Sequence, residues 1–181
     1  MSASSRPILV CYDGSPGARR ALKAAGTLCP GQPAIVLYVW SAAAAERAVH
    51  HPVEAVRHEL IEEVRTAARR DARAIAAEGT RLASRAGLDA RPLIFEAADG
   101  TADAIEHVAN TESAGAVVIG RRSRARLRPL LLGSVSRTVV DHCPTPVLVV
   151  ASVSTDAHSA ATRDEVARAQ PKDHEVLQKQ A

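Results

Sequence analysis

The chain contains 181 residues, a length that corresponds to one domain of ordinary size and leaves little room for a second. Hydrophobic residues make up 46%, charged residues 24% and aromatic residues only 2%, which favours a globular fold and argues against a surface that stacks nucleic-acid bases. The formal net charge of +3 is too small for a protein that coats DNA or RNA. No apolar run approaches the roughly 18 residues of a membrane span. We therefore expect neither a nucleic acid nor a membrane as a partner.

The amino-terminal residues and the cysteines indicate a cytoplasmic protein. Residues 1–6 lead directly into an apolar segment and lack the charged-then-apolar layout of a secretory signal. Cys11, Cys29 and Cys143 are odd in number, scattered, and form no C-x-x-C pair, so we expect reduced thiols. No histidine motif has the spacing of a metal site, and we expect no bound structural metal.

The first part of the chain predicts two buried strands separated by a helix. Residues 7–12 (P-I-L-V-C-Y) form a short apolar run that ends in the turn signal D-G-S, which is typical of a strand buried on both faces. Ser15 and Pro16 suit the N-cap and the first position of a helix, which ends before the Pro-Gly pair at 30–31. Residues 34–40 (A-I-V-L-Y-V-W) predict the second strand.

The middle of the chain predicts a loop, a long helix and a weaker strand. The alanine-rich residues 41–52 are expected to form a loop or a loose turn. From Val53 to Ala86, apolar residues recur at helical spacing with charges on the other side, which indicates one long amphipathic helix, loosened at Gly79. Residues 91–95 predict the third, weaker strand.

The last part predicts two more helices and two more strands. A helix begins at Thr101, the fourth strand spans 116–119 and ends at Gly120, a short helix spans 133–142, and the fifth strand spans 147–150. Strands that alternate with helices at this spacing predict right-handed crossovers. The expected fold class is therefore α/β, with an open, doubly wound five-stranded parallel sheet and helices on both faces.

This fold class predicts where a ligand site lies. Ligands bind beyond the carboxyl ends of the strands where the strand order reverses, here at Asp13 and Gly120. Gly120 would let the backbone approach a ligand closely. The pair Gly133-Ser134 at a helix start offers N–H groups, a hydroxyl and the positive end of the helix dipole, which favour a phosphate. An ordinary loop with a glycine hinge and a serine N-cap fits these residues equally well.

Four blocks, in this order, resemble the universal stress protein family. They are Y-D-G-S at 12–15, V-V-I-G at 117–120, L-L-L-G-S-V-S at 130–136 and H-C-P-T-P-V-L-V-V at 142–150. The resemblance covers about residues 6–152. It implies the strand order 3-2-1-4-5, numbering the strands along the chain.

The ATP-binding branch of that family has a glycine, two residues, a second glycine, nine residues, and then Gly-Ser or Gly-Thr. Gly120 and the pair Gly133-Ser134 match this pattern at the right spacing, whereas Ser123 stands in place of the second glycine. A left-handed backbone at that position would disfavour serine by roughly 1 kcal/mol. The resemblance implies that the cofactor is ATP, with or without Mg²⁺.

The same resemblance implies a role for each site residue. Asp13 would contact the ribose or base side of the nucleotide, Val39 would line the adenine pocket, and Ile119 and Gly120 would pack against the ribose and phosphates. The triphosphate would lie along Arg122, Ser123, Gly133, Ser134, Val135 and Ser136. On the residues alone, Asp13 also suits a helix-capping turn, and Arg122 a solvated surface charge.

The resemblance implies a nucleotide-binding domain over residues 1–152, acting as a stress-response binding and signalling module. The polar residues 153–181 are expected to form a disordered tail. A slow ATPase is an alternative, limited by the single obvious acid at the site, Asp13, and by the missing G-x-x-x-x-G-K-[ST] motif. A phospho-receiver domain is less consistent with the acids present. The family strand order would place 147–150 at an edge, which predicts a homodimer, and an interaction module without nucleotide remains open.

Overall fold

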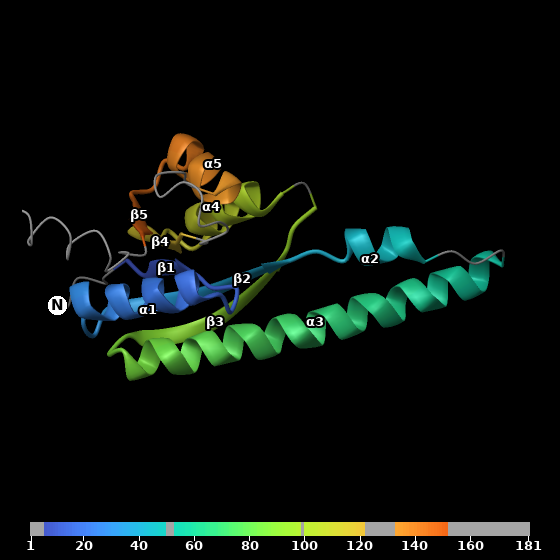
Figure 1. The fold of residues 1–181 in the computed structure, drawn as a ribbon, viewed down its shortest axis with the longest axis horizontal. Helices are drawn as coiled ribbons and strands as arrows, with labels where there is room; N and C mark the ends of the chain where they lie inside the picture. The colour runs from blue at the N-terminus through green and yellow to red at the C-terminus, as the bar shows by residue number, and fades with distance from the viewer. Residues whose placement is uncertain (1–5, 50–52, 99, 122–132, 152–181) are drawn as a thin grey trace, which may run out of the picture.

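Five parallel strands form one sheet with helices on both faces, as Figure 1 shows. The computed structural model describes residues 6–49, 53–98, 100–121 and 133–151. The strand order is β3-β2-β1-β4-β5, and every pairing is parallel, so the predicted fold class and strand order are confirmed. The strands are β1 (Ile8–Cys11), β2 (Pro33–Trp40), β3 (Asp89–Glu96), β4 (Ala116–Gly120) and β5 (Val147–Val150).

The helices divide between the two faces of the sheet (Figure 1). Residues of α1 and α3 pack on one face, and residues of α4 and α5 pack on the other. None of the helices in the described ranges is long and apolar enough to cross a membrane. The helices are α1 (Pro16–Leu28), α2 (Ala43–Ala48), α3 (Glu54–Arg85), α4 (Thr101–Thr111) and α5 (Ser134–His142).

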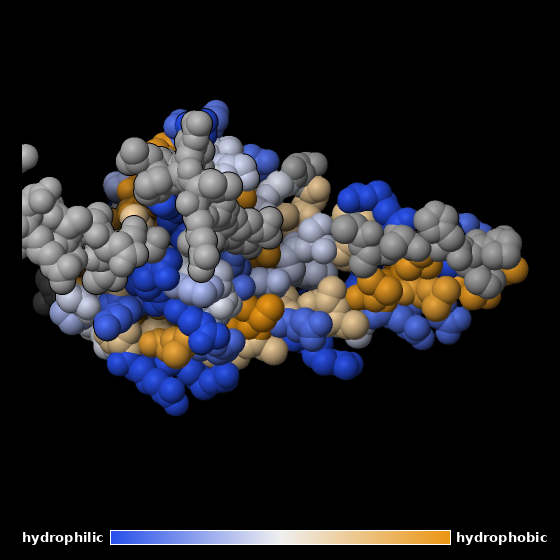
Figure 2. All heavy atoms as spheres, in the orientation of Figure 1, coloured by the Kyte–Doolittle hydropathy of each residue, from blue (hydrophilic) through white to orange (hydrophobic). Residues whose placement is uncertain are grey.

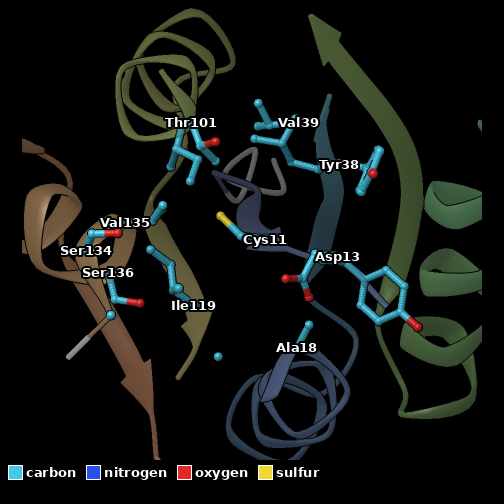
Figure 3. Close-up of a pocket in the computed structure, with 15 residues that line it drawn as sticks. Cys11, Asp13, Ala18, Tyr38, Val39, Thr101, Ile119, Ser134, Val135 and Ser136 are labelled. Atoms are coloured by element: carbon cyan, nitrogen blue, oxygen red, sulfur yellow. The ribbon is translucent and has the colours of Figure 1, made fainter. Parts of the chain in front are cut away.

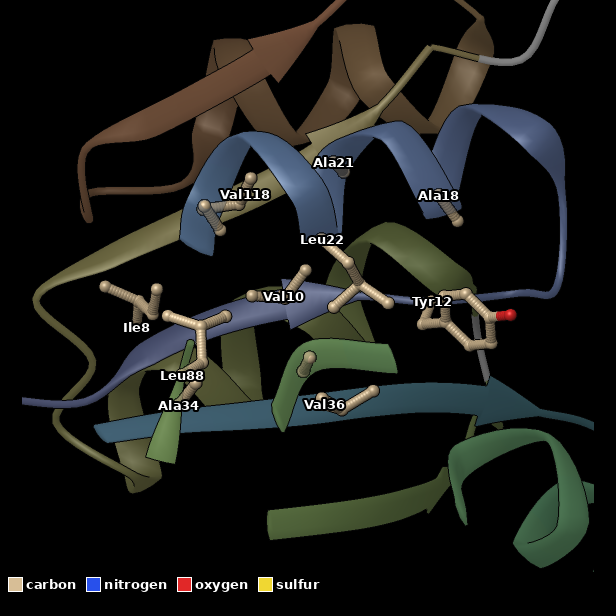
Figure 4. Close-up of a cluster of buried hydrophobic side chains, with 12 residues drawn as sticks. Ile8, Val10, Tyr12, Ala18, Ala21, Leu22, Ala34, Val36, Leu88 and Val118 are labelled. Atoms are coloured by element: carbon tan, nitrogen blue, oxygen red, sulfur yellow. The ribbon is translucent and has the colours of Figure 1, made fainter. Parts of the chain in front are cut away.

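Two buried clusters hold these layers together. Because side chains alternate along a strand, Val10 and Val36 face α1 and α3, whereas Leu9 and Ile35 face α4 and α5. Figure 4 shows Leu22 of α1 directed onto the strands in the first cluster. All five side chains are at most 1% exposed, so the central strands are buried on both faces, as their continuous apolar runs predict.

Three predictions about individual elements are wrong. The expected loop at 41–52 contains α2, because its alanine-rich segment is a strong helix former and no glycine or proline lies between residues 42 and 49. The third strand is not a weak segment at 91–95, since β3 pairs with β2 over all eight of its residues. It tolerates Pro92 because an edge strand needs hydrogen bonds on one side only. Finally, α3 continues through Gly79 without a break.

Gly79 is explained by a tertiary contact and not by a loose helix. A Cβ atom at this position would lie 2.5 Å from Cδ1 of Tyr12 and 2.8 Å from Cγ1 of Val36. The glycine therefore lets α3 lie close against β1 and β2. Other residues on this buried face of α3 are also small, among them Ala72, Ala76 and Ala83.

Candidate functional site

A cavity of about 370 Å³ lies at the carboxyl ends of β1, β2 and β4. The crossover after β1 runs through α1 on one face of the sheet, and the crossover after β4 runs through α5 on the other face. The strand order therefore reverses between β1 and β4, where doubly wound sheets bind their ligands. The amino-terminal turns of α1, α4 and α5 all contribute to the lining (Figure 3).

The structure brings together eight of the ten site residues that the sequence predicts. They come from four separate segments of the chain, and all line the same cavity. The remaining two, Arg122 and Ser123, lie outside the described residues. The eight are Asp13, Val39, Ile119, Gly120, Gly133, Ser134, Val135 and Ser136.

Seven further lining residues were not predicted. Two of them, Cys11 and Leu37, lie on the same sheet face as Leu9 and Ile35, so strand alternation could have identified them. Thr101, the first residue of α4, gave no such signal because α4 begins after the edge strand β3 and reaches the cavity only by crossing back over the sheet. The seven are Cys11, Tyr12, Ala18, Leu37, Tyr38, Thr101 and Ile105.

Asp13 is held in place by the turn that follows β1. The backbone N–H of Ser15 donates a hydrogen bond to Oδ1 of Asp13 at 3.0 Å, and Gly14 supplies the positive φ of +77° that the turn requires. The hydroxyl of Ser15 then accepts a hydrogen bond from the N–H of Ala18 at 3.2 Å and caps α1. Asp13 is therefore both a turn residue and a cavity residue, and the two interpretations of it are compatible.

Gly120 also has a packing role that the sequence did not predict. A Cβ atom at Gly120 would collide with the backbone carbonyl of Gly17 and would lie 2.6 Å from the backbone nitrogen of Ala18. A Cβ atom at Gly17 would in turn collide with the carbonyl of Arg121. The two glycines let the first turn of α1 pack directly on the end of β4. Close helix packing, which builds one wall of the cavity, thus accounts for Gly120 without any ligand.

The amino terminus of α5 forms the opposite wall. Gly133 is its N-cap residue, with φ −62°, and the backbone N–H of Arg137 donates a hydrogen bond to the carbonyl of Gly133 at 2.9 Å. The N–H groups of the three residues before Arg137, 134–136, have no partner within the helix, because a helix leaves its first N–H groups unpaired. A Cβ atom at Gly133 would meet nothing within 4 Å in the described part of the chain, and its φ of −62° suits any residue, so neither backbone strain nor packing against the described residues requires glycine there.

Cys11 lies on the cavity wall but is poorly suited to act as a nucleophile. Burial, with smaller contributions from Cys143 and Asp13, raises the pKa of the Cys11 thiol to about 12. The thiol is therefore protonated at neutral pH, whereas the thiolate is the reactive form. Figure 3 shows its sulfur directed into the cavity between β1 and β4.

The sequence matches the family model described as the Universal stress protein family over residues 4–151. The chain belongs to the universal stress protein family. A search of curated protein sequences finds no match. Among solved structures, the universal stress protein from Archaeoglobus fulgidus has 23% identity and a TM-score of 0.58, covering 80% of this chain and 97% of that one.

Two further solved structures contain a bound nucleotide. One is the Archaeoglobus fulgidus universal stress protein in complex with dAMP, with 21% identity and a TM-score of 0.55, covering 81% of this chain and 98% of that one. The other is a universal stress protein in complex with cAMP, with 22% identity and a TM-score of 0.53, covering 83% of this chain and 100% of that one. These similarities show a shared fold.

In this universal stress protein, the polar groups divide between two sides of the cavity. Figure 3 shows the carboxylate of Asp13 on one side and the residues of the α5 amino terminus, Ser134 and Ser136, on the other. Asp13 is the only carboxylate among the described lining residues. One side thus offers a hydrogen-bond acceptor, and the other offers donors and the positive end of a helix dipole. No group of three His, Cys, Asp or Glu residues in the described ranges could hold a metal ion.

Proposed function

We propose that the cavity binds an adenine nucleotide, ATP in the first place, and that the protein acts as a cytoplasmic stress-response binding module. The observation that carries this proposal is the convergence of three helix amino termini on a cavity at the reversal of strand order. Such termini favour phosphate groups through the helix dipole, and α5 adds the unpaired N–H groups of residues 134–136. The solved family members that hold cAMP and dAMP support an adenine nucleotide as the ligand class.

The division of polar groups gives the nucleotide an orientation. Phosphates would lie against Gly133, Ser134 and the buried Ser136, where backbone N–H groups and hydroxyls can donate. Arg122 and Ser123, in the segment between β4 and α5, are assigned to the same phosphates. An anion would be repelled by the carboxylate of Asp13, which suits hydroxyl donors of the ribose instead.

Val39 supplies the apolar edge for the base. It ends the row of β2 side chains that pack with the α4 and α5 face, and Ile119 lies on the same face on β4, with β1 between the two strands. Both side chains line the cavity, so an adenine ring would exchange water for apolar contacts there. Ile119 and Gly120 would then border the ribose and the first phosphate.

Hydrolysis would be weak at most. Phosphoryl transfer requires positioned metal ligands and a group that orients the nucleophile. Asp13 alone could contribute a carboxylate to Mg²⁺ among the described lining residues, and its Oδ1 already accepts the N–H of Ser15. The cavity thus supports binding better than turnover.

The homodimer would form through β5. This edge strand pairs only with β4 in the described sheet, and Leu148 is 38% exposed, with Val140 of α5 42% exposed. An edge strand that carries apolar side chains invites pairing with a second copy. Light scattering at micromolar concentration would give at least a dimer mass, and Leu148→Lys would lower it, whereas a monomer mass of the unsubstituted chain would contradict the dimer.

The nucleotide proposal is tested by ligand release. Purified protein is denatured, and the supernatant is analysed by chromatography for adenine nucleotides. We expect ATP or AMP from the unsubstituted chain, and none from Gly133→Ala/Ser134→Ala, in which the α5 amino terminus loses its open space and a hydroxyl donor. Ser84→Ala, on an exposed position of α3, is the matched control and should retain the nucleotide.

A contrary result would be equally clear. If the unsubstituted chain releases no nucleotide and also gives no heat when titrated with ATP, the cavity does not bind this ligand. The remaining function would then be that of a dimeric interaction module. Melting curves for all three chains must coincide within a few degrees, since no substituted atom contacts the core.

A further inference from the structure

α3 is much longer than the sheet on which it packs. Its 32 residues span about 48 Å at 1.5 Å per residue, whereas the eight residues of β2 span about 26 Å. Figure 1 shows the amino-terminal half of α3, together with α2, standing away from the sheet and its other helices. We call α2 and residues 54–64 of α3 the arm.

The arm has a defined base. Arg65 lies 3.0 Å from a carboxylate oxygen of Glu96 at the end of β3, and 3.6 Å from one of Glu46 in α2. Ala68 is the most amino-terminal residue of α3 that packs against a buried cluster in the described structure. Beyond this point the helix has no sheet beneath it.

Large apolar side chains lie exposed on the arm. Val56 is 37% exposed and Leu60 is 36% exposed, and Figure 2 shows hydrophobic surface running along this part of the molecule. At 100° per residue, Val56 and Leu60 share one helix face with Ala67 and Ala74, which are also exposed. We call these four residues the outer stripe. It differs from the face that packs on the sheet, which contains Ala72 and the other buried small residues.

The charges along α3 separate into two blocks. Residues 54–63 carry four acidic residues and one basic residue, and residues 65–73 carry four basic residues and one acidic residue. The helix dipole favours acids only in the first turn and bases only in the last. The basic block lies in the middle of the helix, so the dipole does not account for it.

We propose that the outer stripe of α3 docks onto the same stripe of a second copy of this chain, with the two arms antiparallel and a two-fold axis near Val64. This arrangement sets the acidic block of each α3 beside the basic block of the other α3, whereas a parallel arrangement would set like charges together. It also lays Leu60 near Ala67 of the second copy and Val56 near Ala74, so that large side chains meet small ones. The interface is independent of β5 and of nucleotide binding.

Three residues flanking the outer stripe test the charge pairing. Glu59, Glu63 and Arg70 are all exposed on one side of the stripe, and in the antiparallel dimer the two glutamates lie near the arginine of the other copy. Glu59→Arg/Glu63→Arg makes this side wholly positive, and Arg70→Glu makes it wholly negative. Each variant repels itself, but the two are complementary to each other.

The experiment measures sedimentation mass against concentration in chains that also carry Leu148→Lys, so that pairing through β5 does not contribute, and circular dichroism checks folding. We expect each variant alone to weaken arm association about tenfold, since several exposed charge pairs are affected in a symmetric dimer. An equimolar mixture of the two variants should restore association, and 1 M salt should weaken it in the unsubstituted chain. Lys23→Glu, a charge reversal on an exposed position of α1, is the control and should have no effect.

Two results would overturn the proposal. One is an association constant that is the same in both variants as in the unsubstituted chain. The other is a failure of the mixed, folded variants to reassociate. Pairing through β5 cannot mimic the expected pattern, because every chain measured carries Leu148→Lys and none of the charge reversals lies on β5.

Discussion

The two halves of α3 differ in what their apolar side chains contact. On the half that packs on the sheet, the fully buried residues are small, among them Ala72 and Gly79, and the larger Ile75 and Leu82 are partly buried beside them. The arm instead exposes Val56 and Leu60. A helix normally buries its large side chains and exposes polar ones. The packed half departs from this pattern where the helix comes closest to the strands, because a Cβ atom at Gly79 would already be too close to Tyr12 and Val36. The exposed half departs from it because the second surface that would cover it belongs to another molecule.

Among single substitutions, we expect Gly79→Leu to lower the free energy of unfolding most. Even a Cβ atom there would lie 2.5 Å from the ring of Tyr12, so a leucine must push α3 away from the sheet. We expect a loss of about 3 kcal/mol in the free energy of unfolding, measured by urea denaturation. Thr66→Leu, at an exposed position of the same helix, should change stability by less than about 0.5 kcal/mol. An equal loss of unfolding free energy at the two positions would contradict the close packing of α3 on the sheet.

A smaller effect is expected for Tyr12→Phe. The hydroxyl of Tyr12 donates to Oε1 of Glu78 at 3.0 Å, and Arg19 lies 2.8 Å from the same oxygen, so the phenol connects β1 to the packed half of α3 and to α1. Losing this hydrogen bond should cost about 1 kcal/mol near pH 7.

The same tyrosine gives the protein a pH dependence. Burial, and then the hydrogen bond to Glu78, raise the pKa of Tyr12 above its ordinary value of about 10. The folded state therefore holds the proton more tightly than the unfolded state, and stability falls as the pH rises above about 10. Urea denaturation between pH 7 and 11 should show a shallower fall for Tyr12→Phe. An identical fall in both chains would contradict this role.

Arg65→Gln should affect the arm more than the sheet. It removes the ion pairs with Glu46 and Glu96 at the base of the arm, and because these groups are partly exposed we expect a loss of about 0.5 kcal/mol. Amide hydrogen exchange should accelerate in α2 and remain unchanged in β1. Faster exchange throughout the sheet would mean that the arm is not a separate unit of stability.

The smallest effect on the unassociated chain is expected for Leu60→Ala. The side chain is 36% exposed and alanine favours a helix, so the free energy of unfolding in dilute solution should change by less than about 0.5 kcal/mol. Urea denaturation at low protein concentration measures this. A loss of 2 kcal/mol or more would place Leu60 in the core of a single chain and remove the basis for a docking stripe.

Much of the fold could be predicted because local signals agree with the tertiary structure. The apolar runs of β1 and β2 are buried on both faces, and the Ser15-Pro16 and Gly133-Ser134 pairs do begin α1 and α5. The errors concern elements that such signals describe poorly. The edge strand β3 is one example. None of its residues is fully buried, and its exposed and half-buried residues do not alternate regularly, so its sequence lacks the apolar run of a central strand.

Site residues that directly follow a strand could be predicted from the sequence, whereas those brought to the cavity by a crossover helix could not. Asp13 and Gly120 lie at the ends of adjacent strands, which the α/β pattern alone brings together. Thr101 reaches the cavity through the path of α4 across the sheet. Gly79 and Gly120 are glycines for tertiary reasons, close contacts with Tyr12 and Gly17, which no local pattern reveals.

Calorimetric titration with ATP tests the central claim most directly, using nucleotide-free protein in three forms. We expect one site per chain in the unsubstituted protein, the same dissociation constant in Leu60→Ala, and no binding in Gly133→Ala/Ser134→Ala. Binding would then belong to the cavity at the strand ends and not to the arm. Absence of heat in the folded unsubstituted chain, or unchanged affinity in the cavity variant, would contradict the account.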